Sequence, residues 1–183
     1  MGSNWRTLSS KSLIRDRWID LRADRCLTPS GTEVSPYYVL NYPDWVHIVA
    51  LTPERDVLLV RQYRHGAGLS LLGLPAGTVD GSDDGVEGAA RRELAEETGY
   101  LSDRWLSAGA LYPNPAMQTN RVHTFLALDA VPRHEQKLDE GEEGLTLSSM
   151  PLAEILPALD RGLFSQAMHV ASMFLAARLI ETL

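Results

Sequence analysis

The chain has 183 residues, 44% of them hydrophobic, and a formal net charge of −7 at pH 7. This length and composition predict a globular domain with a good core and room for a small appendage. The excess of acidic residues argues against an open nucleic-acid-binding surface, so we expect no nucleic acid among the partners.

Cysteine content and hydropathy bear on the compartment. Cys26 is the single cysteine, so no intrachain disulfide can form, which suits a reducing compartment. No apolar run is long enough to span a membrane, and the first residues lack the apolar core of a signal peptide. We therefore expect a cytoplasmic protein with no membrane partner.

Short β-strands are predicted along residues 5–40. Ile19, Leu21 and Ala23 alternate with charged residues, as in a half-buried strand. A turn signal and a second β-prone run follow. Because so small a β segment buries little apolar surface alone, we expect it to pack on the main domain or on a second subunit.

The next predicted hairpin ends in a basic and aromatic run. Residues 45–51 and 57–60 are apolar and β-prone, with a turn between them, and residues 69–74 predict a further strand. The second strand of the hairpin runs into Arg61, Gln62, Tyr63 and Arg64. Two arginines that flank a tyrosine can hold phosphate and stack on a base. A strand end with a solvated basic face is the alternative interpretation.

Residues 91–100 contain three glutamates and end near a glycine that is typical of a helix C-terminus. Glu93, Glu96 and Glu97 lie three and four positions apart, so a helix places them on one face. Like charges so placed repel by roughly 0.2–0.5 kcal/mol per pair. A divalent cation such as Mg²⁺, which takes oxygen ligands, would offset this repulsion. Gly99 predicts the end of the helix, and a solvated acidic helix surface is the alternative interpretation.

A rigid turn separates the next two predicted strands. Residues 105–111 and 121–128 have the composition of strands. Between them, residues 112–115 carry two prolines, each of which fixes its own φ and restricts its neighbour. His123 is expected to lie in the sheet without a catalytic task.

The last part of the chain begins with an acidic, glycine-bearing loop at residues 137–144, which by default is flexible and solvated. A short strand at residues 145–148 and a helix at residues 152–160 are predicted next. Ser165 is expected to cap a second helix. The side chains of that helix expected to lie mostly in the core are Met168, Met173, Phe174, Leu175 and Leu179.

The sequence around the acidic helix resembles the Nudix box, G-x5-E-x7-R-E-U-x-E-E-x-G-U, where U is apolar. The matching residues are Gly77, Arg92, Glu93, Leu94, Glu96, Glu97, Gly99 and Tyr100. The early acid departs from the pattern. Asp83 keeps the five-residue gap and Asp84 keeps the seven-residue gap, so the loop is one residue longer and carries Asp for Glu. An insertion in a loop costs little free energy and leaves the helix face intact.

This resemblance implies an α/β fold: a Nudix α/β/α sandwich with a mixed β-sheet over residues 43–183, after an antiparallel β appendage over residues 1–42. It implies metal-dependent hydrolysis of a nucleoside diphosphate linked to another moiety. The implied ligands of Mg²⁺ or Mn²⁺ are Glu93, Glu97, Glu96 and the carbonyl of Ala76. Arg92 would orient a neighbouring carboxylate.

The sequence does not decide which residue is the general base. Glu96 is one candidate. Relatives place an acidic loop between the late strand and the last helices, where it supplies a further metal ligand or the base. The loop candidates in this chain are Glu140, Glu142 and Glu143.

Further features resemble the branch of ADP-ribose and nucleoside diphosphate sugar pyrophosphatases. They are the run at residues 61–64, the Leu-Pro-Ala-Gly sequence at residues 74–77, the downstream proline and the N-terminal β segment. Gly73 departs from this branch, in which many relatives carry a glutamate that contacts a sugar or ribose. The implied substrate-binding residues are Arg61, Gln62, Tyr63, Arg64 and Pro115.

The branch resemblance implies hydrolysis of ADP-ribose or an ADP-sugar to AMP and a sugar phosphate, by a homodimer that uses the N-terminal segment. Two alternatives stay open. One is a Nudix hydrolase of another substrate, such as coenzyme A, a dinucleoside polyphosphate or another nucleoside diphosphate sugar. The other is a nucleotide-binding sensor without turnover, against which the intact set of three glutamates argues.

Overall fold

The computed structural model describes residues 4–183, which form two compact units. The first unit holds the N-terminal segment up to Pro43 together with Tyr112–Arg121. The second holds Asp44–Leu111 together with Val122–Leu183.

The predicted division of the chain at residues 42 and 43 stays a prediction. Residues 1–3 of the predicted N-terminal segment lie outside the described residues. The grouping of residues 112–121 with that segment was not expected from the sequence, because nothing local in those residues indicates which partner they contact.

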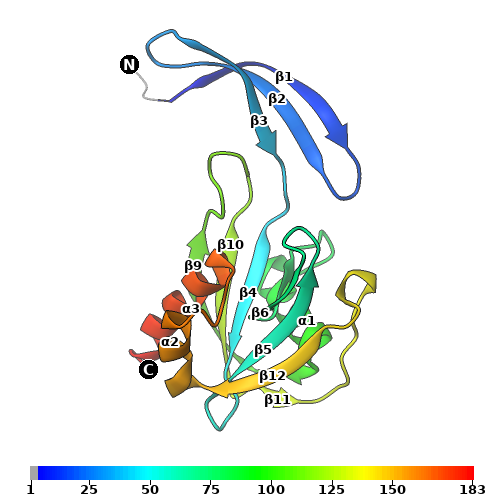
Figure 1. The fold of residues 1–183 in the computed structure, drawn as a ribbon, viewed down its shortest axis with the longest axis vertical. Coiled ribbons are helices and arrows are strands. Elements are labelled where there is room, and N and C mark those ends of the chain that lie inside the picture. Colours follow the sequence, from blue (N-terminus) through cyan, green and yellow to red (C-terminus); the bar gives the residue numbers. More distant parts are fainter. Residues whose placement is uncertain (1–3) are drawn as a thin grey trace. The chain divides into compact units, whose positions relative to one another are not determined.

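A three-stranded antiparallel sheet, in the order β1-β2-β3, forms most of the first unit (Figure 1). Its strands are β1 (Arg6–Arg15), β2 (Asp20–Leu27) and β3 (Glu33–Leu40). All ten residues of β1 are exposed. Near the end of β3, the N–H of Leu40 donates to the carbonyl of Met117 at 2.7 Å. The antiparallel β appendage is therefore present, and it leaves much apolar surface in solvent.

Two sheets form the centre of the second unit. One has the order β7-β4-β10-β9 and the other the order β12-β5-β6. The strands of the first are β4 (Trp45–Ala50), β7 (Ala76–Thr78), β9 (Arg104–Leu111) and β10 (Val122–Leu128). Those of the second are β5 (Asp56–Arg64), β6 (Leu69–Gly73) and β12 (Thr146–Pro151). The pairing of β4 with β10 is parallel and the other pairs are antiparallel, so the sheet structure is mixed, as predicted.

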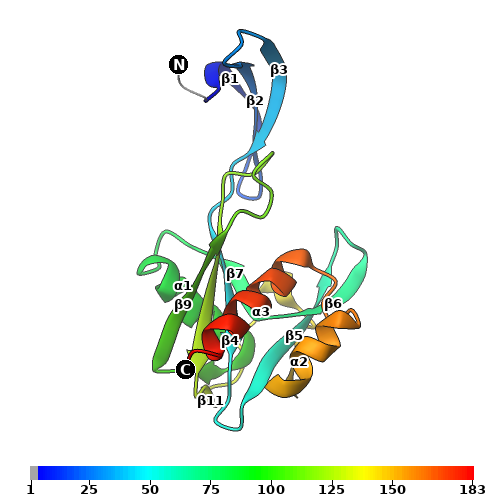
Figure 2. The same ribbon diagram turned by 90° about the vertical axis from the view of Figure 1, so that its left-hand side faces the viewer.

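Helices lie on both sides of these sheets (Figures 1 and 2). They are α1 (Gly85–Thr98), α2 (Leu152–Asp160) and α3 (Ala167–Ile180). A 3₁₀ turn, η1 (Glu140–Glu142), and a small pair of strands, β8 (Tyr100–Leu101) and β11 (Val131–Pro132), complete the unit. Among residues 4–183, no helix combines the length and the apolar character needed to traverse a bilayer.

Strand β4 is buried on both faces and joins two cores. Its residues Val46, Ile48 and Ala50 pack with Leu94 and other residues of α1. Val49 belongs to the other cluster, which includes residues of α2 and α3. Because successive side chains of a strand point to opposite faces, one apolar strand serves both layers. The predicted α/β/α sandwich is confirmed.

Two predictions about α3 were wrong. The helix begins at Ala167 after Gln166, whose extended backbone marks the N-cap, so Ser165 does not cap it. Phe174 is 47% exposed instead of lying in the core. The buried face of α3 is formed by His169, Ser172, Met173, Ala176 and Ala177, and Phe174 lies off that face. The two polar members of this face broke the apolar periodicity on which the prediction relied.

Candidate active site

Helix α1 ends where the sequence predicted. Gly99 has a φ of 74°, and its N–H donates to the carbonyl of Ala95 at 2.9 Å. A Cβ on residue 99 would lie 2.1 Å from the carbonyl oxygen of His134. Neither the left-handed backbone nor the available space suits a side chain there, so glycine ends the helix and fixes its position.

Two of the three predicted glutamates are buried against the turn that precedes α1. Glu97 is 1% exposed, and its Oε2 accepts a hydrogen bond from the N–H of Ala76 at 2.9 Å. Glu93 is 7% exposed, and a Cβ on Gly77 would lie 2.0 Å from its carboxyl carbon. The box begins with glycine because the Glu93 carboxylate occupies the space beside it. The side chain of Glu96 is 40% exposed, so the three glutamates do not share one environment.

Arg92 connects the acidic face to the loop before the helix. Its guanidinium donates to both carboxylate oxygens of Asp83, at 2.8 and 3.0 Å, and to the carbonyl of Thr78 at 2.9 Å. It also donates to Glu93 at 2.7 Å and to Glu96 at 3.0 Å. The hydrogen bonds from Arg92 lower the pKa of Asp83. Asp83, and not Asp84, is therefore the acid of the lengthened loop that reaches the helix.

Burial makes ionisation of the carboxyl groups at this face unfavourable. It raises the pKa of Glu97 to about 8, a rise that the Ala76 N–H opposes and the charges of Glu142 and Glu93 increase. Burial also raises the pKa of Glu93, against the effect of Arg92. Removal of carboxylates from water disfavours their ionised form, so a nearby added cation would stabilise it.

These residues fit a hard divalent cation. Within residues 4–183, no three His, Cys, Asp or Glu side chains already converge as a complete metal cluster. The buried face nevertheless offers several carboxylate oxygens whose charge Arg92 alone does not balance. Oxygen donors of this kind suit Mg²⁺ and Mn²⁺. The predicted ligand roles of Glu93, Glu96, Glu97 and Ala76 stay predictions.

The loop around η1 brings one of its three glutamates to the acidic face. The charge of Glu142 acts on both Glu93 and Glu97, and burial raises the pKa of Glu142 itself. Its carboxylate accepts the N–H of Asp139 at 3.1 Å, which fixes the turn. Glu140 and Glu143, by contrast, are exposed.

The run at residues 61–64 is divided between two faces of β5. Gln62 is buried, and its Nε2 donates to the carbonyl of Gly141 at 3.2 Å, which joins β5 to the acidic loop. Arg64 faces the same side, and its charge opposes the rise that burial causes in the pKa values of Glu97 and Glu142. Arg61 and Tyr63 are exposed on the other face. Pro115 belongs to the first unit, and its role, like those of residues 61–64, stays a prediction.

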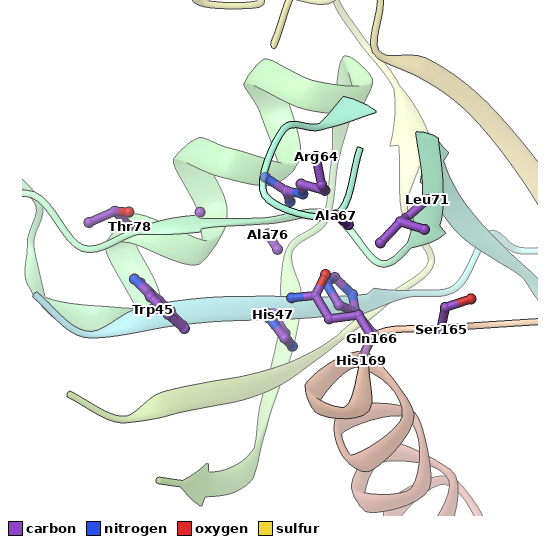
Figure 3. A pocket seen from close by; sticks show the side chains of 11 residues that line it. Trp45, His47, Arg64, Ala67, Leu71, Ala76, Thr78, Ser165, Gln166 and His169 are labelled. Atoms are coloured by element: carbon purple, nitrogen blue, oxygen red, sulfur yellow. The ribbon is translucent and has the colours of Figure 1, made fainter. Parts of the chain in front are cut away.

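A cavity of about 460 Å³ adjoins the turn at Ala76 (Figure 3). Its lining includes Arg64, which the sequence singled out, and residues that it did not: Trp45, His47, Gln166 and His169. Each of the two histidines is only 3% exposed. His47 lies in the apolar strand β4, and His169 lies on the buried face of α3. A histidine within an apolar run is the signal by which the sequence could have identified them.

The two buried histidines lie against each other. Their ring centroids are 4.2 Å apart with planes inclined by 22°. His47 Nδ1 is 2.9 Å from the hydroxyl oxygen of Ser172. The hydroxyl of Thr124 donates to that same oxygen at 2.9 Å. Burial lowers the pKa of His47 to about 4 and that of His169 well below its ordinary value. Both rings are therefore neutral near pH 7.

Comparison with protein families gives two matches that together cover most of the chain. The NUDIX domain matches residues 42–168. The nucleoside diphosphate sugar hydrolase N-terminal domain matches residues 5–40.

Several characterised proteins are similar to the chain. It is 30% identical over 138 residues to an ADP-ribose pyrophosphatase of Bacillus subtilis, a match that covers 75% of this chain and 74% of the relative. It is 30% identical over 181 residues to an ADP-ribose pyrophosphatase of Mycobacterium tuberculosis, covering 98% and 86%. A crystal structure of an ADP compounds hydrolase shares the fold, with a TM-score of 0.85 at 23% identity over 97% of this chain and 95% of the other.

Proposed function

The chain belongs to the NUDIX family, and we propose that it hydrolyses ADP-ribose or an ADP-sugar to AMP and a sugar phosphate, with Mg²⁺ or Mn²⁺. The observation that carries this proposal is the buried pair Glu93 and Glu97 beside Ala76, at the edge of a cavity that Arg64 lines. The names of the two similar pyrophosphatases and the match of the N-terminal segment support the substrate class.

Each group of the site has a task in this proposal. Glu93, Glu96, Glu97 and the carbonyl of Ala76 would hold the cation, which when bound neutralises pyrophosphate charge and lowers the pKa of a bound water. Arg92 orients the Glu93 carboxylate by a charge-assisted hydrogen bond. Arg64 lies where its guanidinium can pair with a phosphate oxygen.

Glu142 is the general base that we favour among the four candidates. It is partly buried, and its charge acts on the glutamates of α1. Burial raises its pKa, and a base is most effective when its pKa approaches the working pH. Glu96, Glu140 and Glu143 are the alternatives, and Gln variants of all four would rank them by kcat.

The decisive experiment measures AMP release from ADP-ribose with Mg²⁺ by the wild type, Glu97→Gln and Glu93→Gln. We expect both variants to lower kcat by more than about 100-fold, since each loses a charge that acts on the reacting group. Glu87→Gln is the matched control, because Glu87 is an exposed residue of the same helix that pairs with Arg91. Near-normal kcat in both site variants would contradict the assignment.

Substrate scope and the sensor alternative are tested with the same protein. A panel of nucleoside diphosphate sugars, coenzyme A and dinucleoside polyphosphates would show whether ADP-ribose gives the highest kcat/KM. Tight binding of ADP-ribose by the wild type without AMP release would favour a nucleotide sensor.

We propose a homodimer that uses the first unit. Trp5 and Ile14 are each 50% exposed and Trp18 is 74% exposed, and apolar exposure of this kind marks an interaction surface. Light scattering is expected to give twice the mass of one chain. Removal of residues 1–40 is expected to give a monomer, and a monodisperse full-length monomer would contradict the proposal.

A cytoplasmic location is proposed on separate grounds. Cys26 is buried and unpaired, which suits a reducing compartment. Cell fractionation with detection of the native protein would test it.

A further inference from the structure

His169 and Gly73 fit together in a way that only glycine permits. Gly73 ends β6, directly before the turn that carries Ala76. A Cβ on residue 73 would lie 2.8 Å from Nδ1 and 2.9 Å from Cε1 of His169. The imidazole from α3 thus occupies the space into which a side chain of residue 73 would project.

Three contacts fix the orientation of the His169 ring. Its Nδ1 accepts the backbone N–H of Leu74 at 2.9 Å. One face stacks on His47, and Phe164 approaches at a centroid distance of 6.2 Å with an interplanar angle of 69°. A buried ring held on several sides has few alternative rotamers, so the direction of its second nitrogen is set by the fold.

The tautomer of His169 follows from the same hydrogen bond. Because the Leu74 N–H is a donor, Nδ1 must be the unprotonated nitrogen, and in the neutral ring the proton is on Nε2. Burial lowers the pKa of His169, which keeps the ring neutral. Nε2–H is therefore a fixed, uncharged donor.

This donor has no protein partner within residues 4–183. In that part of the chain, the fully buried side-chain nitrogen and oxygen atoms without a hydrogen-bond partner belong to Gln62 and Asn120. Nε2 of His169 is not one of them, so this unpartnered atom is not fully buried. His169 lines the cavity together with Gln166 and Arg64 (Figure 3). Nε2–H is thus open to the cavity and available to whatever occupies it.

The lining of the cavity indicates the kind of group that it receives. His169, Gln166 and Arg64 offer N–H donors, and oxygen atoms of hydroxyl groups accept from all three. A sugar carries several hydroxyl oxygens close together, so a lining with three N–H donors suits a hydroxyl-bearing sugar.

We propose that His169, positioned by Gly73 and the Leu74 N–H, is a specificity-determining residue that donates a hydrogen bond from Nε2 to a hydroxyl oxygen of the sugar beyond the pyrophosphate. This inference rests on the proposed function, because the sugar reaches the cavity only when the pyrophosphate lies on the acidic face of α1. It assigns to α3 a direct part in substrate selection.

Two substitutions separate this role from a structural one. The amide oxygen of His169→Asn matches the position of Nδ1, so this variant keeps the acceptor for Leu74 and loses the donor at Nε2. The amide nitrogen of His169→Gln reaches the position of Nε2, so this variant keeps the donor and loses the acceptor. We expect His169→Asn to lower kcat/KM for ADP-ribose by about 3- to 10-fold, mainly through KM, as for the loss of one neutral hydrogen bond. We expect His169→Gln to retain most of the wild-type kcat/KM.

A second series identifies the contacted hydroxyl. The effect of His169→Asn is expected to vanish with the one deoxy analogue of the distal sugar that lacks the accepting oxygen. Gly73→Ala is expected to raise KM by displacing the ring, whereas Gly66→Ala is the matched control, since its Cβ would meet no atom within 4 Å.

The possible results distinguish a failure of this inference from a failure of the proposed function. If the wild type is active, and His169→Asn matches its kcat/KM while His169→Gln is impaired, the role of Nε2 is overturned. An effect that persists with every distal deoxy sugar, or that vanishes only when the nucleoside is altered, would overturn the assignment to the sugar. A wild type that turns over no nucleoside diphosphate compound would overturn both proposals.

Discussion

The two units of the protein are both built largely from β-strands, but they bury their side chains very differently. In the first unit, β1 exposes all ten of its residues. In the second, five of the six residues of β4 are buried, and the strand contributes to two cores. Hydrogen bonding between strands is common to both, so what distinguishes them is the apolar surface removed from water. The second unit supplies its own packing, whereas β1 of the first leaves its side chains in solvent, which agrees with the proposed dimer.

The largest expected effect comes from truncation of one leucine in each unit. Leu126 is 0% exposed in the second unit and Leu13 is 41% exposed in the first. We expect Leu126→Ala to lower the free energy of unfolding by about 2–5 kcal/mol and Leu13→Ala to change it by less than about 0.5 kcal/mol. Urea titration followed by circular dichroism on dilute protein measures both values, and equal losses would contradict the contrast between the units.

Acid should weaken the second unit through His47. Its pKa falls from an ordinary 6.5 to about 4 on folding, so the unfolded chain binds more protons than the folded one between these values. The contribution of His47 to the free energy of unfolding should therefore decrease as the pH is lowered through this window, by about 3 kcal/mol. Glu97, whose folded pKa of about 8 lies above its ordinary value of 4.5, contributes in the opposite direction as the pH falls. The test is therefore the difference between wild type and His47→Asn in thermal melts from pH 7 to pH 4. The stability of wild type relative to His47→Asn should fall toward pH 4, and a constant difference would refute the explanation.

A smaller effect should distinguish the two aspartates of the loop before α1. Asp83→Asn removes the charge that holds Arg92, whereas Asp84 is at the N-cap and makes no side-chain capping bond. Loss of such a supporting contact typically lowers activity by about 10–100-fold, and we expect the lower end because Thr78 still holds Arg92. Steady-state kcat for ADP-ribose measures it, with Asp84→Asn as the control. Equal kcat in the two variants would show that the loop acid has no such role.

The smallest expected change in folding stability accompanies a change in assembly. Ile14→Ser and Trp18→Ala alter exposed side chains of the first unit. We expect them to shift a dimer toward the monomer in sedimentation while the melting temperature of the dilute protein moves by only a few degrees. A large loss of stability in the monomer would mean that the first unit has a core of its own.

Local patterns allowed much of the fold and the acidic face to be predicted. Glu93 and Glu97 were identified because helical spacing is short-range, and Gly99 because a left-handed C-cap favours glycine regardless of the surroundings. The buried strand β4 was recognisable from its apolar run. These features depend on residues within about ten positions of one another.

Contacts between distant segments could not be predicted. Strand alternation divides Arg61 and Tyr63 from Gln62 and Arg64, but the sequence does not say which face borders the site. The approach of His169 to Gly73 joins residues 96 positions apart. The same limitation explains the incorrect placement of Phe174, because the side of α3 that faces the sheet is decided by packing and not by hydropathy alone.

The guanidinium of Arg92 gives the lengthened loop before α1 an unexpected tolerance. Asp83 is anchored to Arg92, and the preceding turn is closed by its own bonds, with Asp80 N–H donating to Asp83 and Ser82 N–H to Asp80, each at 2.8 Å. An added residue can therefore be taken up as a bulge into solvent without moving the anchored acid. For recognising such sites in other sequences, the useful criterion is whether some carboxylate can reach the arginine, and a fixed count from the first glycine is too strict.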